Sequence, residues 1–133
     1  MFQVESKIGK IAAQLEDVFE IISDFSNIPR FIPPEKLEGI KADKEALMFT
    51  LPEMGEMTLS IEKKEPYSLV KYIGNFREQT FMLYIQLKSP TPGDTRFKIT
   101  LRADMPSVVG WAVKGKMQTM LDELVNRIEK IYA

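Results

Sequence analysis

The stretch MPSVVGWAVKGKMQTMLDELVNRIEKIY, residues 105–132, has the residue spacing of one long amphipathic helix. Its apolar residues recur at steps of three and four, which places them on a single helical face. They are Val109, Val113, Met117, Met120, Leu121, Leu124, Ile128 and Ile131. Pro106 suits a first helical turn, where a missing N–H is tolerated. A helix from Pro106 to Tyr132 would be about 40 Å long, so it needs a broad apolar surface to cover that face.

The middle of the chain supplies such a surface, because its apolar period changes to two, the period of a strand. We predict strands at 37–43, 46–52, 56–65, 69–76, 80–89 and 95–104. The gaps between them are short and rich in turn residues, so successive strands are expected to form antiparallel hairpins. The predicted inward rows are Leu47/Phe49/Leu51, Met57/Leu59/Ile61, Phe81/Leu83/Ile85/Leu87 and Phe97/Ile99/Leu101. For segment 69–76 both faces remain candidates for the inner one.

The N-terminal part is predicted to form one strand and two short helices. Residues 2–11 alternate loosely, as a strand does. Residues 15–25 have helical spacing, and Ser26 or Asn27 could cap a second helix that Pro33-Pro34 must end. The whole chain, residues 1–133, therefore predicts one α+β domain with a sheet of about seven antiparallel strands, apolar on one face and closed by the C-terminal helix.

Composition excludes several classes of protein. The net charge is −1 with both signs interspersed, which gives no basic stripe for nucleic acid. No apolar run is long enough to span a bilayer, and the N-terminus lacks the pattern of a secretion signal, so we expect a cytoplasmic protein. The chain has no cysteine and no histidine, which removes thiolate chemistry and the commonest general base and metal ligand. We expect no metal and no cofactor.

The order of elements is similar to the helix-grip fold of the START-like superfamily (SRPBCC), which includes Bet v 1-like proteins, polyketide cyclases and lipid-transfer domains. VFEIISDFSNIPRFIPPEKLEGIK, residues 18–41, resembles that superfamily's segment from first helix to second strand. FMLYIQLKSPTPGDTRFKITLRADMPSVVGWAVKGKM, residues 81–117, resembles its last hairpin and the start of its long helix. The chain is most similar to small bacterial members, and it lacks the iron ligands of Rieske oxygenase catalytic domains.

The resemblance implies a cavity between sheet and helix that holds a hydrophobic small molecule or lipid, with no catalysis. The expected lining residues are Phe31, Phe49, Leu59, Ile61, Tyr72, Phe81, Leu83, Tyr84, Phe97, Ile99, Val113, Met117 and Met120. Tyr72 and Tyr84 are the expected polar groups that orient the ligand. The same residues could instead form a filled core, because protein interiors pack densely.

The sequence is compatible with two other functions. The first is a cyclase- or dehydratase-like enzyme in which a Tyr or Glu moves protons. Its candidate residues are Arg30, Glu38, Glu56, Lys71, Tyr72, Arg77 and Tyr84. The second is a homodimer or protein partner bound through Val108 and Trp111, which lie on the back of the long helix. Alternatively, the loop near Pro33-Pro34 covers the helix face that contains Val108 and Trp111.

Overall fold

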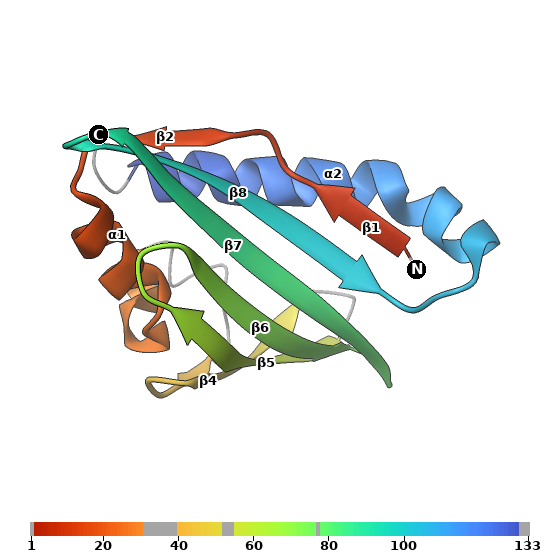
Figure 1. Cartoon of the computed structure of the whole chain (residues 1–133). Coiled ribbons are helices and arrows are strands. Elements are labelled where there is room, and N and C mark those ends of the chain that lie inside the picture. The colour runs from red at the N-terminus through yellow and green to blue at the C-terminus, as the bar shows by residue number, and fades with distance from the viewer. Residues whose placement is uncertain (1, 31–39, 52–54, 77, 131–133) are drawn as a thin grey trace.

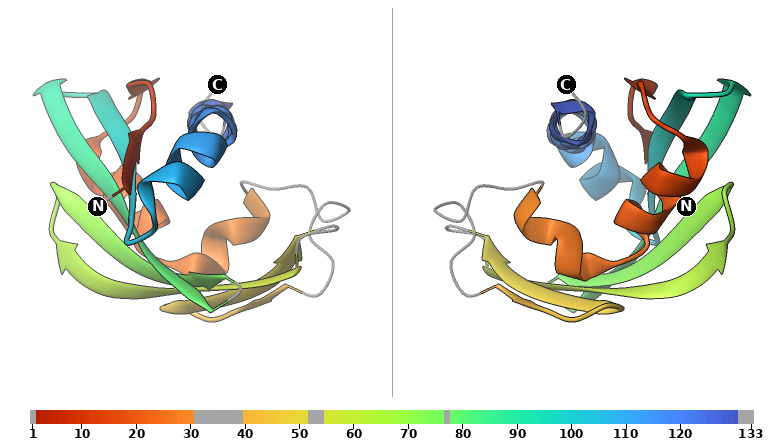
Figure 2. Two further views of the ribbon diagram at one scale, coloured as in Figure 1. Left: turned by 90° about the vertical axis from the view of Figure 1, so that its right-hand side faces the viewer. Right: turned by 90° about the vertical axis from the view of Figure 1, so that its left-hand side faces the viewer.

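The computed structural model of the chain shows a curved antiparallel sheet with a long helix on its concave side (Figures 1 and 2). It describes residues 2–30, 40–51, 55–76 and 78–130, without the side chains of residues 28–30, 49, 51 and 107. The elements are β1 (Phe2–Glu5), β2 (Gly9–Ile11), α1 (Leu15–Ile22), η1 (Phe25–Arg30), β3 (Lys41–Ala42), β4 (Ala46–Leu51), β5 (Gly55–Glu65), β6 (Leu69–Phe76), β7 (Gln79–Thr91), β8 (Asp94–Ala103) and α2 (Ser107–Lys130). The predicted α+β class is confirmed.

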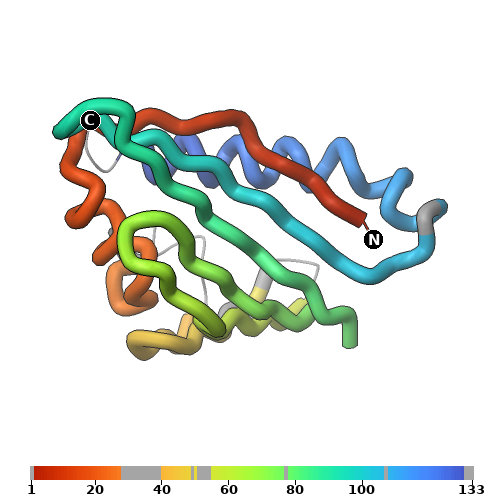
Figure 3. Tube along the Cα trace, in the orientation of Figure 1, coloured from red at the N-terminus to blue at the C-terminus, as the bar shows by residue number. Residues whose placement is uncertain are grey.

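The strands from β3 to β8 pair as consecutive hairpins, and β1 and β2 both pair with β8. The sheet has eight strands because the predicted strand 2–11 is broken in two. At the break, Ser6 N donates to the Ile99 carbonyl over 2.8 Å, and Ile99 N donates to Ser6 Oγ over 2.9 Å. The Ser6 side chain thus takes over one backbone position of the ladder. Figure 3 shows the two short strands following β8 one after the other.

The inner face of the sheet is apolar, and its residues lie side by side in rows across the strands. Leu59, Gly74, Phe81 and Ala103 form one row, and Ile61, Tyr72, Leu83 and Leu101 form the next. Val70, Ile85 and Ile99 form a third row, and Leu87 and Phe97 a fourth. This assignment settles the open question for β6, because Val70 and Tyr72 are buried and face inward.

The helix α2 is rotated relative to the predicted apolar face. Its buried residues are Gly110, Leu121, Val125 and Ile128. The predicted members Val109 and Met120 are 49% and 41% exposed, so their assignment to the buried face was wrong. The helix runs closest to β1, β2 and β8, where a Cβ on Gly110 would lie 2.6 Å from the Phe2 ring. This close approach turns the face that contains Gly110 toward the sheet.

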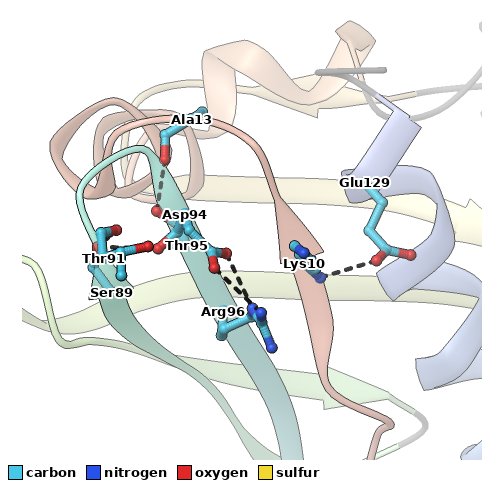
Figure 4. A network of polar contacts seen from close by, with 8 residues as sticks. All are labelled: Lys10, Ala13, Ser89, Thr91, Asp94, Thr95, Arg96 and Glu129. Atoms are coloured by element: carbon cyan, nitrogen blue, oxygen red, sulfur yellow. Dashed lines mark hydrogen bonds and ion pairs between the residues drawn. The ribbon is translucent and has the colours of Figure 1, made fainter.

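Polar side chains of α2 bind the outer edge formed by β1 and β2. Lys7 N donates to Asp122 Oδ1 over 2.7 Å, and Lys10 N donates to Glu129 Oε2 over 2.9 Å. Figure 4 shows the second contact beside the β7–β8 turn, where Thr95 Oγ1 donates to the Ala13 carbonyl over 2.9 Å. These backbone N–H groups have no strand beside them, and the helix carboxylates satisfy them.

The short helix η1 is capped by Asp24 and not, as predicted, by Ser26 or Asn27. Asp24 Oδ1 accepts hydrogen bonds from Ser26 Oγ at 2.6 Å and from Ser26 N at 2.9 Å. These two bonds hold the pKa of the Asp24 carboxyl below its usual value. Phe25 N donates to the Lys44 carbonyl over 3.1 Å, so this cap also fixes η1 against the turn before β4.

Replacing Asp24 by alanine is expected to lower the free energy of unfolding by about 1 kcal/mol at neutral pH, because a helix cap is lost. A depressed folded-state pKa stabilises the protein above the unfolded pKa, and that contribution is lost as pH falls through the folded pKa. The difference between the two proteins should therefore shrink below pH 3.8, the ordinary value for this carboxyl. Urea denaturation at neutral pH and at about pH 2 measures it. Asp24→Asn keeps the acceptor and should cost little; an equal loss for both variants would contradict the capping role.

Candidate functional site

Four apolar side chains on the inner face are only half-buried. They are Leu59 and Ile61 on β5 and Phe81 and Leu83 on β7, which we call the half-buried patch. They belong to the first two rows, which contain Gly74 and Tyr72 of β6. The other two rows are fully covered, since Val70 and Ile99 are each 0% exposed. In the first two rows Tyr72, Leu101 and Ala103 are buried as well, so the partial exposure is confined to the four side chains of the patch.

The helix side of this region is half-buried as well. Val113, Met117 and Leu124 of α2 are partly exposed, whereas Leu121, Val125 and Ile128 close the core at the other end of the helix. Met117 and Leu124 pack against the edge of the core. Sheet and helix therefore both leave part of their apolar side-chain surface exposed here.

Gly74 shapes the floor of the patch. It lies between Leu59 and Phe81 in the row across the sheet. A Cβ on Gly74 would lie 2.1 Å from Cζ of Phe81, so only glycine lets the Phe81 ring lie flat against β6. Neither Gly74 nor Leu124 was among the predicted site residues. An isolated glycine inside the strand pattern 69–76 is the sequence signal that could have identified the first.

Tyr72 lies between Ile61 and Leu83, but its hydroxyl is already used. The phenol is buried and donates a hydrogen bond to the Ile22 carbonyl at the end of α1. Burial raises the pKa of Tyr72 far above neutrality, so the group stays protonated as a donor to the backbone. Its ring lines the floor, and its ring centroid lies 5.5 Å from that of Phe25.

Apart from Met120 of α2, which is 41% exposed, the other predicted lining residues divide into three groups. Phe97 and Ile99 are fully buried and belong to the closed core. Tyr84 lies on the outer face of the sheet, where Arg102 and Lys71 lie 5.2 and 5.7 Å from its ring centroid; its predicted contact with a ligand on the inner face was wrong because it alternates with Leu83 and Ile85 along β7. Phe31 and the side chain of Phe49 lie outside the described residues.

The half-buried patch lacks side chains that could act as catalytic acids or bases. The patch and its inner-face neighbours on β6 and β8 carry no acidic or basic side chain. Among the enzyme candidates, Glu56 is exposed, and Lys71 is paired with Glu62 at 3.3 Å; Glu38, Arg77 and the side chain of Arg30 lie outside the described residues. Within the part of the chain that the structure describes, no group of three or more acidic side chains could hold a metal ion.

The back of the first half of α2 faces solvent. Val108 is 82% and Trp111 86% exposed, so Trp111 is not packed beneath a loop. Residues 33–34, the loop named as the alternative cover for this face, lie outside the described residues. Of the helices in the described residues, none has the length and hydrophobicity needed to cross a membrane.

No family model matches the chain, and no curated protein matches it in sequence. Many solved structures do match its fold. The protein XoxI from Bacillus cereus is 14% identical with a TM-score of 0.77, and the match covers 99% of this chain and 96% of that one. DynU16, from the dynemicin biosynthetic locus, is 10% identical with a TM-score of 0.71 over 98% of this chain and 46% of its own.

A START superfamily protein from Mycobacterium smegmatis is 17% identical with a TM-score of 0.62, and the match covers 97% of this chain and 98% of that one. These similarities agree with the observed order of elements, in which a curved antiparallel sheet lies around a long C-terminal helix. Because the sequence identities are only 10–17%, the similarities show the fold and nothing about function. The chain therefore has the START-like helix-grip fold.

Proposed function

We propose that the chain is a cytoplasmic binding protein for a hydrophobic small molecule or lipid, held between the sheet and α2, without catalysis. The observation that carries this proposal is the half-buried patch, whose apolar side chains are partly exposed on the inner face of the sheet. The START superfamily protein among the structurally similar chains supports the same reading.

The chemistry of the region favours an apolar ligand. Leu59, Ile61, Phe81 and Leu83 from the sheet and Met117 from the helix would contact it, and Met117 can adapt to different ligand shapes because its side chain is flexible. Covering about 200 Å² of apolar surface would contribute about 5 kcal/mol to binding. Within the two rows that contain the patch no side chain is charged, so the part of the ligand that lies on them should be uncharged.

A cyclase-like enzyme has less support. Tyr72 is the titratable residue in the floor, and its hydroxyl is bound to a backbone carbonyl with a raised pKa. A general acid or base needs a pKa near the working pH and access to the reacting atoms.

Replacing Met117 by tryptophan tests whether the space beside the patch is free. We expect the free energy of unfolding to change by less than about 1 kcal/mol, because the indole would enter uncovered space and not a dense core. Uptake of an apolar fluorescent dye or a fatty acid should fall, because the indole takes the place of the ligand. Thermal melts by circular dichroism and dye titration measure the two effects.

Leu121→Trp is the matched control, since Leu121 lies one turn further along α2 and is buried. It should cost roughly 1–3 kcal/mol or more, because the core there has no room. If Met117→Trp costs as much as the control and the parent protein takes up no apolar probe, the proposed function is wrong.

A further inference from the structure

The first turns of α2 carry an uncovered apolar stripe. Val108 and Trp111 are exposed almost completely, and Ala112 and Gly115 are exposed beside them. At 3.6 residues per turn these four residues fall within about 100° of the helix circumference. Figure 1 shows that this end of the helix extends past the start of β1. Two large apolar side chains are therefore presented to solvent on a projecting element.

The charged side chains of α2 beside the stripe are basic, and the exposed Asp104 precedes the helix. No acidic residue occurs in α2 before Asp122. Lys114 and Lys116 flank the stripe on its two sides, both exposed, and neither forms an ion pair with a residue that the structure describes. Beyond Gly115 the same side of the helix becomes polar, with Thr119 and Glu123. The apolar part of this side of the helix is thus confined to the projecting end.

We propose that this helix tip, formed by Val108, Trp111, Ala112, Gly115 and the two lysines, docks on the surface of a membrane that carries anionic lipids. Tryptophan is favoured at the boundary between headgroups and acyl chains, and lysines beside an apolar stripe bind lipid phosphates. The acidic second half of α2 binds the β1–β2 edge through Asp122 and Glu129, so the tip can contact an anionic surface while these carboxylates remain bound to the protein.

A second copy of the chain fits this surface less well. A stable interface buries about 800 Å² on each partner, whereas one exposed Trp and one exposed Val supply a fraction of that area. Two lysines on each tip would also repel each other across a symmetric contact. A shallow insertion into lipid needs only a few apolar side chains together with basic ones. The docking does not depend on whether the half-buried patch binds a ligand.

Trp111 is the single tryptophan of the chain, so its fluorescence reports on this surface alone. The unaltered protein is mixed with vesicles of phosphatidylcholine and with vesicles that also contain phosphatidylglycerol. We expect the Trp111 emission to shift to shorter wavelength only with the anionic vesicles. Lipids brominated on the acyl chains should quench this emission, and the protein should sediment together with the anionic vesicles. High salt should reverse the binding.

Two variants test the assignment to the tip. Val108→Glu and the double variant Lys114→Gln/Lys116→Gln should each weaken partitioning roughly tenfold or more, because they remove apolar contact or charge at the lipid surface. Their matched controls, Gln86→Glu on the exposed outer face of β7 and Lys88→Gln/Lys130→Gln, change the same charges elsewhere and should have little effect.

Three results would overturn the proposal. One is an unchanged emission with both kinds of vesicle. Another is binding that the controls weaken as much as the tip variants do. The third is a shift to shorter wavelength that depends on protein concentration without lipid, together with a dimer in analytical ultracentrifugation, which would assign the tip to a second copy.

Discussion

Replacing Gly9 by alanine is expected to lower the free energy of unfolding by about 3 kcal/mol. A Cβ at this position would lie 2.3 Å from Cε1 of Phe97 and 2.9 Å from Cγ1 of Val125. Both neighbours are buried in the closed core, so neither can move away without displacing others. The added methyl group would force β2 away from α2 and would disturb the contacts of the helix with the sheet edge.

Gly115→Ala is the matched control, because a Cβ there meets nothing within 4 Å. It should stabilise the protein by up to about 1 kcal/mol, since alanine favours the helix over glycine. Urea denaturation followed by circular dichroism compares both variants with the parent. A Gly9→Ala protein as stable as the parent would show that β2 and α2 do not pack as closely as described.

Replacing Tyr72 by phenylalanine is expected to cost about 2 kcal/mol, because it leaves a buried carbonyl without a donor. The carbonyl of Ile22 is one of the last four of α1, which lack partners within the helix, and the Tyr72 hydroxyl satisfies it. Ligand uptake should change little, because this hydroxyl is bound to the backbone and its ring remains.

Tyr84→Phe serves as the comparison. Among the described residues, the hydroxyl of Tyr84 has one weak contact, of 3.6 Å, with Met82 Sδ on the outer face, so its loss should cost less than about 0.5 kcal/mol. Chemical denaturation of the two variants gives the difference directly. Equal stabilities would contradict the role of Tyr72 as a cap for α1, and loss of dye uptake in Tyr72→Phe alone would instead assign its hydroxyl to the ligand.

The architecture was predictable because the long helix and the hairpins repeat their apolar residues with clear periods. The predicted bounds of the strands at 46–52, 56–65 and 69–76 agree with β4, β5 and β6 to within one residue. The break at Ser6 was not predictable. A serine gives residues 2–11 the same pattern of polar and apolar residues whether or not its side chain replaces a backbone hydrogen bond. The rotation of α2 was missed for a similar reason: residues 108–113 are apolar on all sides, so spacing alone does not select the face.

The candidate site was predicted less well than the fold. Alternation placed Leu59, Ile61, Phe81 and Leu83 on one face, and they share it. The alternation did not reveal that Phe97 and Ile99, which lie on the same face, are fully buried. Burial depends on where α1 and α2 rest on the sheet, which is a matter of tertiary packing and leaves no mark on the period of a strand.

The hydrogen bonds from Lys7 and Lys10 to the helix carboxylates limit how copies of this sheet could join end to end. Growth of a continuous sheet through many molecules requires two open edges on each, as in a fibril. Here α2 occupies the β1–β2 edge, which leaves the β3–β4 side as the other edge of the sheet. Two molecules that paired there would each present, at the far edge, N–H groups of Lys7 and Lys10 that already bind α2, which opposes further growth into a fibre.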